Sequence, residues 1–251
     1  MPRYVILLAY DGTHYAGWQK QPDARSVQGE IEQALQTLTQ EEILLYGSGR
    51  TDTGVHAEEQ FAHFDAHIPV ETSWLTGRLR RILPEDIFIR HIKEVPEHFH
   101  ARFDAQWRQY RYQLLRAPDP FQRLYAWHPG NDLNWDVVDR CLEMLKGEHD
   151  FSGFSRKSGD LPHFRCTILS ADRVDVGQNV VAIRIRANRF LRSMMRAVVG
   201  GLVSVACGKK EAGWFQKQLD KGTELDNFGF APPQGLYLEK VFYPKSLLDL
   251  T

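Results

Sequence analysis

Short apolar segments of strand length alternate with amphipathic helical segments along the whole chain, and this alternation constrains the fold more than any other feature. Residues 3–10 form a buried strand pattern, and the apolar residues from Val27 to Leu38 recur at helical spacing after Ser26, a suitable N-cap. Further strands are expected at 42–46, 60–65 and 87–94, and a helix at 73–83. The first part of the chain is therefore expected to form an α+β unit.

The second part of the chain repeats the same kinds of segment. We expect strands at 107–115, 166–176, 180–187 and 236–243, and helices at 135–146, 190–207 and 211–220. The predicted fold class is α+β, with two mixed subdomains of largely antiparallel sheet flanked by helices. We place the boundary at residues 1–103 and 104–251 and expect the functional cleft between the two subdomains.

Apolar runs and cysteines limit the classes of protein to consider. The run 198–205 is too short to cross a bilayer, and the N-terminal residues lack the layout of a signal peptide. Cys141, Cys166 and Cys207 lie too far apart for a CxxC metal knuckle, and a disulfide framework is not expected. These features predict a cytoplasmic protein with reduced thiols.

Charge is segregated along a chain whose net charge is only −1. Residues 1–60 hold four cations against nine acids, whereas residues 176–210 hold seven cations and no Asp or Glu. One basic surface for nucleic acid is therefore possible on a nearly neutral molecule. The alternative is that these arginines lie on solvated strand and helix faces.

The glycine-rich segment 47–57, GSGRTDTGVHA, is the most unusual in the chain. Its glycines allow tight backbone geometry and close approach of a substrate around Arg50 and Asp52. It lacks the Gly-Lys-Ser/Thr of a phosphate loop and the spacing of a dinucleotide-binding loop. A structural alternative, in which Asp52 only caps a turn, stays open on the local pattern.

Other catalytic and metal-binding patterns are weaker. Asp52-Thr53-Gly54 spells the aspartic protease triplet, but the chain has one copy, and Arg50 would pair with Asp52 and hold it ionised. His63 and His67 are four apart on an expected strand, a spacing that does not bring two imidazoles to one metal. No Gly-x-Ser-x-Gly elbow of a serine hydrolase occurs.

The expected strand 107–115 combines aromatic and cationic residues. Alternation places Tyr110 and Tyr112 on one face, a pattern that suits stacking on an extruded base, although tyrosines in strands more often belong to the core. Arg184 and Arg186 share a face of another strand. Arg192 and Arg196 are one turn apart on the expected helix 190–207 and could share a face.

Several ordered blocks of the chain resemble the tRNA pseudouridine synthase A family over nearly its whole length. The resemblance is carried by YDGTHYAGWQKQP (10–22), SVQGEIEQAL (26–35), GRTDTGVHA (49–57), FHARFDA (99–105), RQYRYQL (108–114), HDFSGF (149–154), FLRSMMR (190–196) and APPQGLYLEKVFY (231–243). Met195 and the segment Ala206-Cys207-Gly208 depart from the family pattern, and these departures affect packing only.

The resemblance implies a pseudouridine synthase fold and a catalytic set consisting of Asp52, Arg50, Tyr110 and Arg196. Asp52 would be the nucleophile, the two arginines its charge partners, and Tyr110 the residue against the target base. The substrate would be uridine at positions 38, 39 and 40 in the anticodon stem-loop of tRNA, modified without metal or organic cofactor by a homodimer. Further RNA contacts are expected from Arg78, Arg80, Arg81, Arg184 and Arg192.

Two alternative functions, from other classes of protein, remain open on the sequence. The chain could bind tRNA as a chaperone without performing chemistry, or it could be a dimeric aspartic protease. The first predicts that Asp52 is dispensable, and the second predicts peptide cleavage at acid pH with pepstatin-type inhibition.

Overall fold

The computed structural model describes the chain except for residues 131, 157–162, 212, 222–228 and 249–251. Contacts divide the chain into two compact units. Unit 1 comprises Met1–Trp107 and Tyr237–Thr251, and unit 2 comprises Arg108–Leu236. The chain therefore passes between the units twice, whereas the sequence pattern indicates a single boundary near residue 104.

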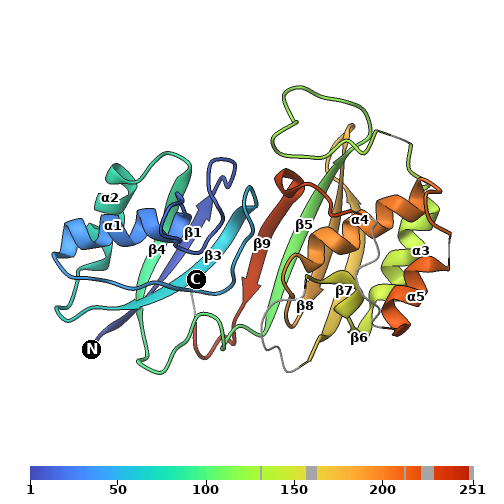
Figure 1. The fold of residues 1–251 in the computed structure, drawn as a ribbon. Coiled ribbons are helices and arrows are strands. Elements are labelled where there is room, and N and C mark those ends of the chain that lie inside the picture. Colours follow the sequence, from blue (N-terminus) through green and yellow to red (C-terminus); the bar gives the residue numbers. More distant parts are fainter. Residues whose placement is uncertain (131, 157–162, 212, 222–228, 249–251) are drawn as a thin grey trace. The chain divides into compact units, whose positions relative to one another are not determined.

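Unit 1 is built on a mostly antiparallel sheet with β1 between β4 and β3 (Figure 1). Its strands are β1 (Arg3–Tyr10), β2 (Tyr46–Gly47), β3 (His56–Asp65), β4 (Ile87–Val95) and β9 (Leu236–Phe242). β2 adds to β3 in antiparallel fashion, while His56 and Ala57 of β3 pair in parallel with Tyr237 and Leu238. β1 is paired on both edges, and the side chains of its apolar run from Tyr4 to Leu8 are buried.

The two helices of unit 1, α1 (Val27–Thr39) and α2 (Thr72–Ile82), have defined caps. The Ser26 hydroxyl accepts a hydrogen bond from the backbone N–H of Gly29, as the sequence predicts for the start of α1. The carboxylate of Glu71 accepts from the first N–H groups of α2. α1 and α2 contact each other, and α2 packs against β4.

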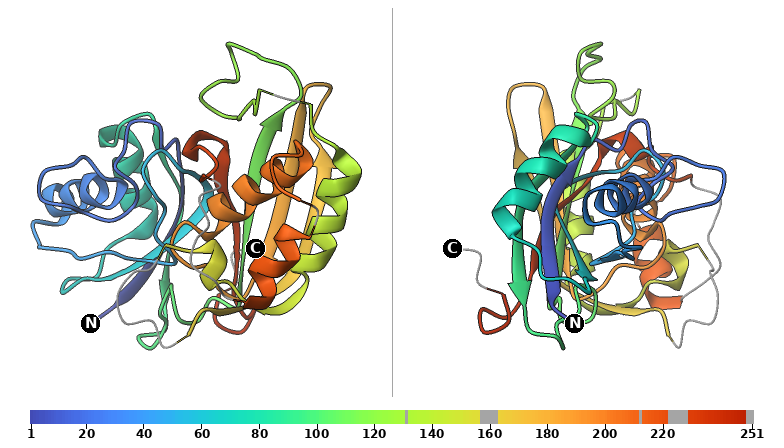
Figure 2. Two further views of the ribbon diagram at one scale, coloured as in Figure 1. Left: turned by 45° about the vertical axis from the view of Figure 1, so that its right-hand side comes forward. Right: turned by 90° about the vertical axis from the view of Figure 1, so that its left-hand side faces the viewer.

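Unit 2 contains an antiparallel sheet in the order β5-β8-β7-β6, in which β6 pairs with β7. Its elements are β5 (Trp107–Leu115), α3 (Trp135–Leu145), β6 (Gly147–Asp150), β7 (Arg165–Asp175), β8 (Val180–Ala187), α4 (Met194–Ala206) and α5 (Trp214–Lys221), with 3-10 turns at Ser152–Phe154 and Pro233–Gly235. Figures 1 and 2 show α3, α4 and α5 gathered against one face of this sheet.

The two faces of the unit 2 sheet differ in polarity. Tyr110 and Tyr112 are buried and pair across the ladder with Ile185 and Ile183, so that these four side chains share the apolar face. The other face carries cross-strand partners that are polar and half-buried: Gln109, Arg111, Arg184 and Arg186. The predicted alternation of β5 and the shared face of Arg184 and Arg186 are therefore confirmed.

Several expected elements differ from the structure in their bounds; the strand expected at 60–65, for example, begins at His56. The expected strand 42–46 shortens to Tyr46–Gly47, because the backbone N–H and C=O of Leu45 bond to the side chains of Glu32 and Gln28 on α1. The expected helix 190–207 begins only at Met194, because Ser193 adopts a left-handed conformation with φ 57°. Arg192 therefore lies before the helix, and the expectation that it shares a helix face with Arg196 is wrong.

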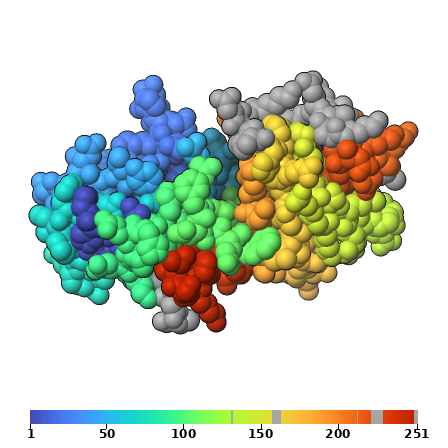
Figure 3. Space-filling view, turned by 90° about the horizontal axis from the view of Figure 1, so that it is seen from below, coloured from blue at the N-terminus to red at the C-terminus, as the bar shows by residue number. Residues whose placement is uncertain are grey.

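The α+β fold class with largely antiparallel sheets is confirmed. The C-terminal segment lies against the segment that precedes β5, since the hydroxyl of Tyr243 donates to the carbonyl of Ala101 at 2.5 Å and Gln106 N donates to Phe242 O at 2.9 Å. In Figure 3 these segments appear side by side in red and green. Within the described residues, none of the helices has the length and apolar character needed to cross a membrane.

Candidate active site

The glycine-rich segment of unit 1 forms the loop between β2 and β3. Ser48 N donates to Phe61 O at 2.7 Å, and the side chain of Gln60 donates to Gly49 O at 2.9 Å and lies 2.5 Å from the hydroxyl of Ser48. Gly54 has φ +75°, a conformation that favours glycine. These bonds fasten the first half of the loop to the buried strand β3.

The segment between β1 and α1 holds the second half of the loop. Trp18 N donates to Thr51 O at 3.2 Å, and Gly54 N donates to Tyr15 O at 3.2 Å. Val55 N donates to Asp52 O at 3.1 Å and closes the turn that contains Asp52. The segment between β1 and α1 and the loop 47–57 are therefore joined by backbone hydrogen bonds around Asp52.

Asp52 and Arg50 occupy different environments within this loop. Asp52 is half-buried, and Arg50 is exposed. Within the described part of the chain, no ion pair joins the Arg50 guanidinium to the Asp52 carboxylate. The exposed position of Arg50 leaves its side chain able to contact a bound anion.

A buried imidazole, that of His56 at the start of β3, contacts the segment after β1 and was missed by sequence reasoning. Nδ1 of His56 accepts a hydrogen bond from Gly12 N at 3.1 Å and lies 3.0 Å from Asp11 Oδ1. Its ring stacks on Tyr237 with 4.7 Å between centroids. The sequence signal was available, since Asp11 and His56 belong to the blocks that begin at residues 10 and 49.

Tyr110 and Arg196 lie in unit 2, whereas Asp52 and Arg50 lie in unit 1. Tyr110 is buried, and its ring meets the ring of Phe190 edge to face at 4.7 Å. Aromatic pairs of this geometry hold each other in place. Phe190, which sequence reasoning passed over although it begins the block at 190–196, is therefore a neighbour of the candidate base-contacting residue.

Arg196 is fixed in the first turn of α4. Its Nε donates to the carbonyl of Ala231 at 2.8 Å, and the N–H of Ala231 donates back to the carbonyl of Arg196 at 3.0 Å. The guanidinium lies 5.9 Å from the centroid of the Phe230 ring. Burial raises the pKa of the nearby Tyr112 phenol well above its usual value, and the charge of Arg196 opposes that shift.

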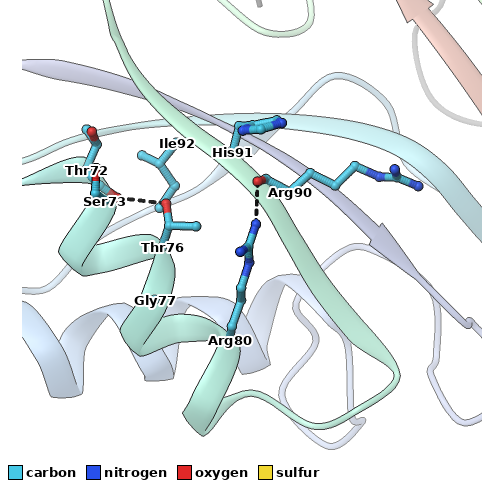
Figure 4. A pocket seen from close by; sticks show the side chains of 8 residues that line it. All are labelled: Thr72, Ser73, Thr76, Gly77, Arg80, Arg90, His91 and Ile92. Atoms are coloured by element: carbon cyan, nitrogen blue, oxygen red, sulfur yellow. Dashed lines mark hydrogen bonds between the residues drawn. The ribbon is translucent and has the colours of Figure 1, made fainter.

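The arginines of α2 differ in what they do. Arg80 donates to the carbonyls of Ile89 and Arg90, both at 2.7 Å, and fastens α2 to β4 beside a pocket of about 360 Å³ (Figure 4). Arg78 and Arg81 are exposed on the same helix. Arg80 is thus a structural residue, and its two neighbours present their charge to solvent.

The arginines expected on unit 2 are dispersed. Arg184 lies on the face of the sheet opposite Tyr110, as their ladder partners require. On that face Arg186 donates to Gln109 Oε1 at 3.0 and 2.7 Å. Arg192 is exposed before α4. Among the described residues there is no group of three or more His, Cys, Asp or Glu side chains that could hold a metal ion.

Comparison with known proteins gives one family. The family model described as tRNA pseudouridine synthase matches residues 6–104 and 142–244. The chain is similar to proteins named tRNA pseudouridine synthase A from Thermosipho melanesiensis (39% identity, 97% of this chain and 100% of the relative), Chlorobaculum tepidum (40%, 94% and 96%) and Porphyromonas gingivalis (38%, 98% and 99%).

Proposed function

The chain belongs to the tRNA pseudouridine synthase family and isomerises uridine in tRNA to pseudouridine; we propose that it does so at positions 38, 39 and 40 of the anticodon stem-loop, with Asp52 as the nucleophile. The observation that carries the assignment of Asp52 is the loop itself. Its backbone is fastened on both sides of Asp52, while Asp52 as a residue is only half-buried. A preorganised nucleophile that a substrate can reach needs both properties.

The reaction breaks the bond between C1′ of the ribose and N1 of uracil and forms a bond between C1′ and C5. N1 gains a proton and C5 loses one, so the composition of the nucleotide is unchanged. An ionised carboxylate assists by forming a transient bond to the nucleotide, and Asp52 supplies it. No oxidant, reductant or second substrate is required by this balance.

Arg50 and Arg196 act as cationic partners of the carboxylate and of the neighbouring phosphates. A carboxylate that is removed from water when RNA binds needs a positive charge to stay ionised. Arg196 suits this role because its Nε bond to Ala231 fixes the direction of the guanidinium. Arg50 is exposed, so its guanidinium is accessible to the bound RNA.

Tyr110 contacts the target base by stacking. A base must leave the helical stack to be isomerised, at a cost of a few kcal/mol, and an aromatic side chain offsets part of that cost. The edge-to-face contact with Phe190 supports this role because it sets the plane of the Tyr110 ring.

Arginines that are exposed or half-buried supply the remaining affinity by contacting phosphates. We assign Arg78 and Arg81 of α2, Arg184 of β8 and Arg192 before α4 to this role. We also propose that the enzyme acts in the cytoplasm as a homodimer, with one tRNA contacting both subunits.

The decisive experiment maps pseudouridine at single-nucleotide resolution in an unmodified tRNA that carries uridines at positions 38, 39 and 40. Wild-type protein is compared with Asp52→Asn, which is nearly isosteric, and tRNA affinity is measured for both. We expect product in the anticodon arm with wild type, none with the variant, and equal affinity within about threefold because Asp52 contributes little to phosphate binding. Product with Asp52→Asn would exclude Asp52 as the nucleophile, and product outside the anticodon arm would exclude the proposed positions.

A further inference from the structure

Thr51, the residue that precedes Asp52, is held by its side chain as well as by its backbone. Its hydroxyl oxygen lies 2.8 Å from the hydroxyl oxygen of Tyr10, and both groups are buried, with residue exposures of 7% and 4%. The Thr51 carbonyl accepts from Trp18 N on the other side. A buried hydrogen bond of this kind is costly to lose because neither hydroxyl can bond to water instead.

Tyr10 is itself placed with little freedom. It is the last residue of β1, where it pairs with Ala57 of β3 and Ile87 of β4. The register between β1 and β3 shifts between Leu8 and Tyr10, an irregularity of the kind that redirects a side chain at the end of a strand. The Tyr10 ring also packs near Trp18, with 6.1 Å between centroids.

We propose that Tyr10 is a positioning residue for the isomerisation: its hydroxyl fixes Thr51 and thereby sets the position of the Asp52 carboxylate. This inference rests on the proposed role of Asp52 as nucleophile. Tyr10 acts through Thr51 and thereby couples the loop to the sheet. A shift of about 1 Å in a reacting group can lower a rate by about 10²-fold. Loss of one hydroxyl therefore affects the chemical step more than it affects RNA binding.

The test is a double-mutant cycle on the hydrogen bond. Tyr10→Phe, Thr51→Val and the double variant are compared with wild type in single-turnover rate at saturating tRNA, tRNA Kd and Tm. Thr51→Ser keeps the hydroxyl and serves as the conservative variant. Tyr4→Phe is the matched control, because the Tyr4 hydroxyl, also on β1, accepts a partly buried hydrogen bond from Val70 N at 3.1 Å and does not touch the loop.

We expect Tyr10→Phe and Thr51→Val each to lower the single-turnover rate about tenfold or more while Kd changes less than about threefold. The double variant should be no slower than the slower single variant, because both changes remove the same bond. Thr51→Ser should recover most of the rate lost in Thr51→Val. Tyr4→Phe should lower Tm without lowering the rate.

Three outcomes would overturn the proposal. They are a Tyr10→Phe rate equal to that of Tyr4→Phe, losses that multiply in the double variant, and a loss confined to Kd. Asp52→Asn in the same assay separates this proposal from the proposed function. If Asp52→Asn retains activity, the nucleophile assignment fails; if it is inactive while Tyr10→Phe is fully active, only the positioning role fails.

Discussion

Gly17 lies directly against the carbonyl of Thr51: a Cβ atom on Gly17 would be 2.4 Å from Thr51 O. Gly17 also has φ +94°, which an L side chain rarely adopts. We predict that Gly17→Ala displaces the Asp52 loop, lowers the free energy of unfolding by about 2 kcal/mol or more and abolishes most activity. Denaturant unfolding and single-turnover kinetics measure the two effects.

The control for this substitution is Gly77→Ala. Gly77 lies in α2 with nothing within 4 Å of the added methyl group. Alanine in an exposed helix interior should raise the free energy of unfolding by about 0.5–1 kcal/mol and leave the rate unchanged. Equal behaviour of the two variants would contradict the close approach at Gly17.

Local pattern predicted much of the fold but little of the packing around the site. The bounds of β1 and β5 follow from the sequence because each is an apolar or alternating run between turn residues. β6 was not predicted, since its sequence Gly-Glu-His-Asp has no strand signal and depends on pairing with β7. Long-range pairing thus decides elements whose own residues carry no preference.

The candidate site likewise contains residues that the sequence predicts and long-range contacts that it does not. Asp52, Arg50, Tyr110 and Arg196 were predicted from their sequence blocks, but the bond between Tyr10 and Thr51 joins residues 41 apart and has no local signature. The sequence wrongly placed Arg192 on a helix because Leu191 continues the apolar periodicity, although the helix starts after Ser193. Periodicity reports burial, and it does not report the conformation of a single capping residue.

His63 should make stability depend on acid pH. Burial, followed by the charges of His100 and Arg3, lowers the pKa of His63 from 6.5 to about 4. Between these values the unfolded chain binds more protons than the folded one, so stability falls as pH is lowered from 6.5 and the loss is complete below about 4. The expected loss is on the order of 3 kcal/mol.

Urea unfolding of wild type and His63→Gln at pH 7, 6, 5 and 4 tests this dependence on acid pH. The variant should lose less stability than wild type across the window. The pKa of His100 is also lowered by burial, so the variant should keep a smaller dependence of the same sign. Identical curves for both proteins would show that His63 is not responsible.

Arg78 and Arg81 should contribute to the salt dependence of tRNA binding. Each phosphate contact that is removed lowers the slope of log K against log salt by about one. The double variant Arg78→Ala/Arg81→Ala should therefore bind more weakly at low salt and show a slope smaller by about two. Arg165→Ala, which removes a surface partner of Glu148, should keep the wild-type slope. An unchanged slope in the double variant would remove α2 from the RNA-binding surface.

The contribution of Arg196 to the reaction rate should depend on the shape of its side chain as well as on its charge. Lysine in its place keeps a positive charge but lacks the Nε donor to Ala231 and the planar group near Phe230. We expect Arg196→Lys to lower the single-turnover rate about tenfold or more, with a smaller effect on tRNA affinity. Arg173→Lys is the matched control, because it breaks a two-bond ion pair with Asp139, both bonds at 2.7 Å. It should lower stability and spare the rate. If Arg196→Lys reacts as fast as wild type, charge alone suffices and the bond to Ala231 serves only to join α4 to the segment at residue 231.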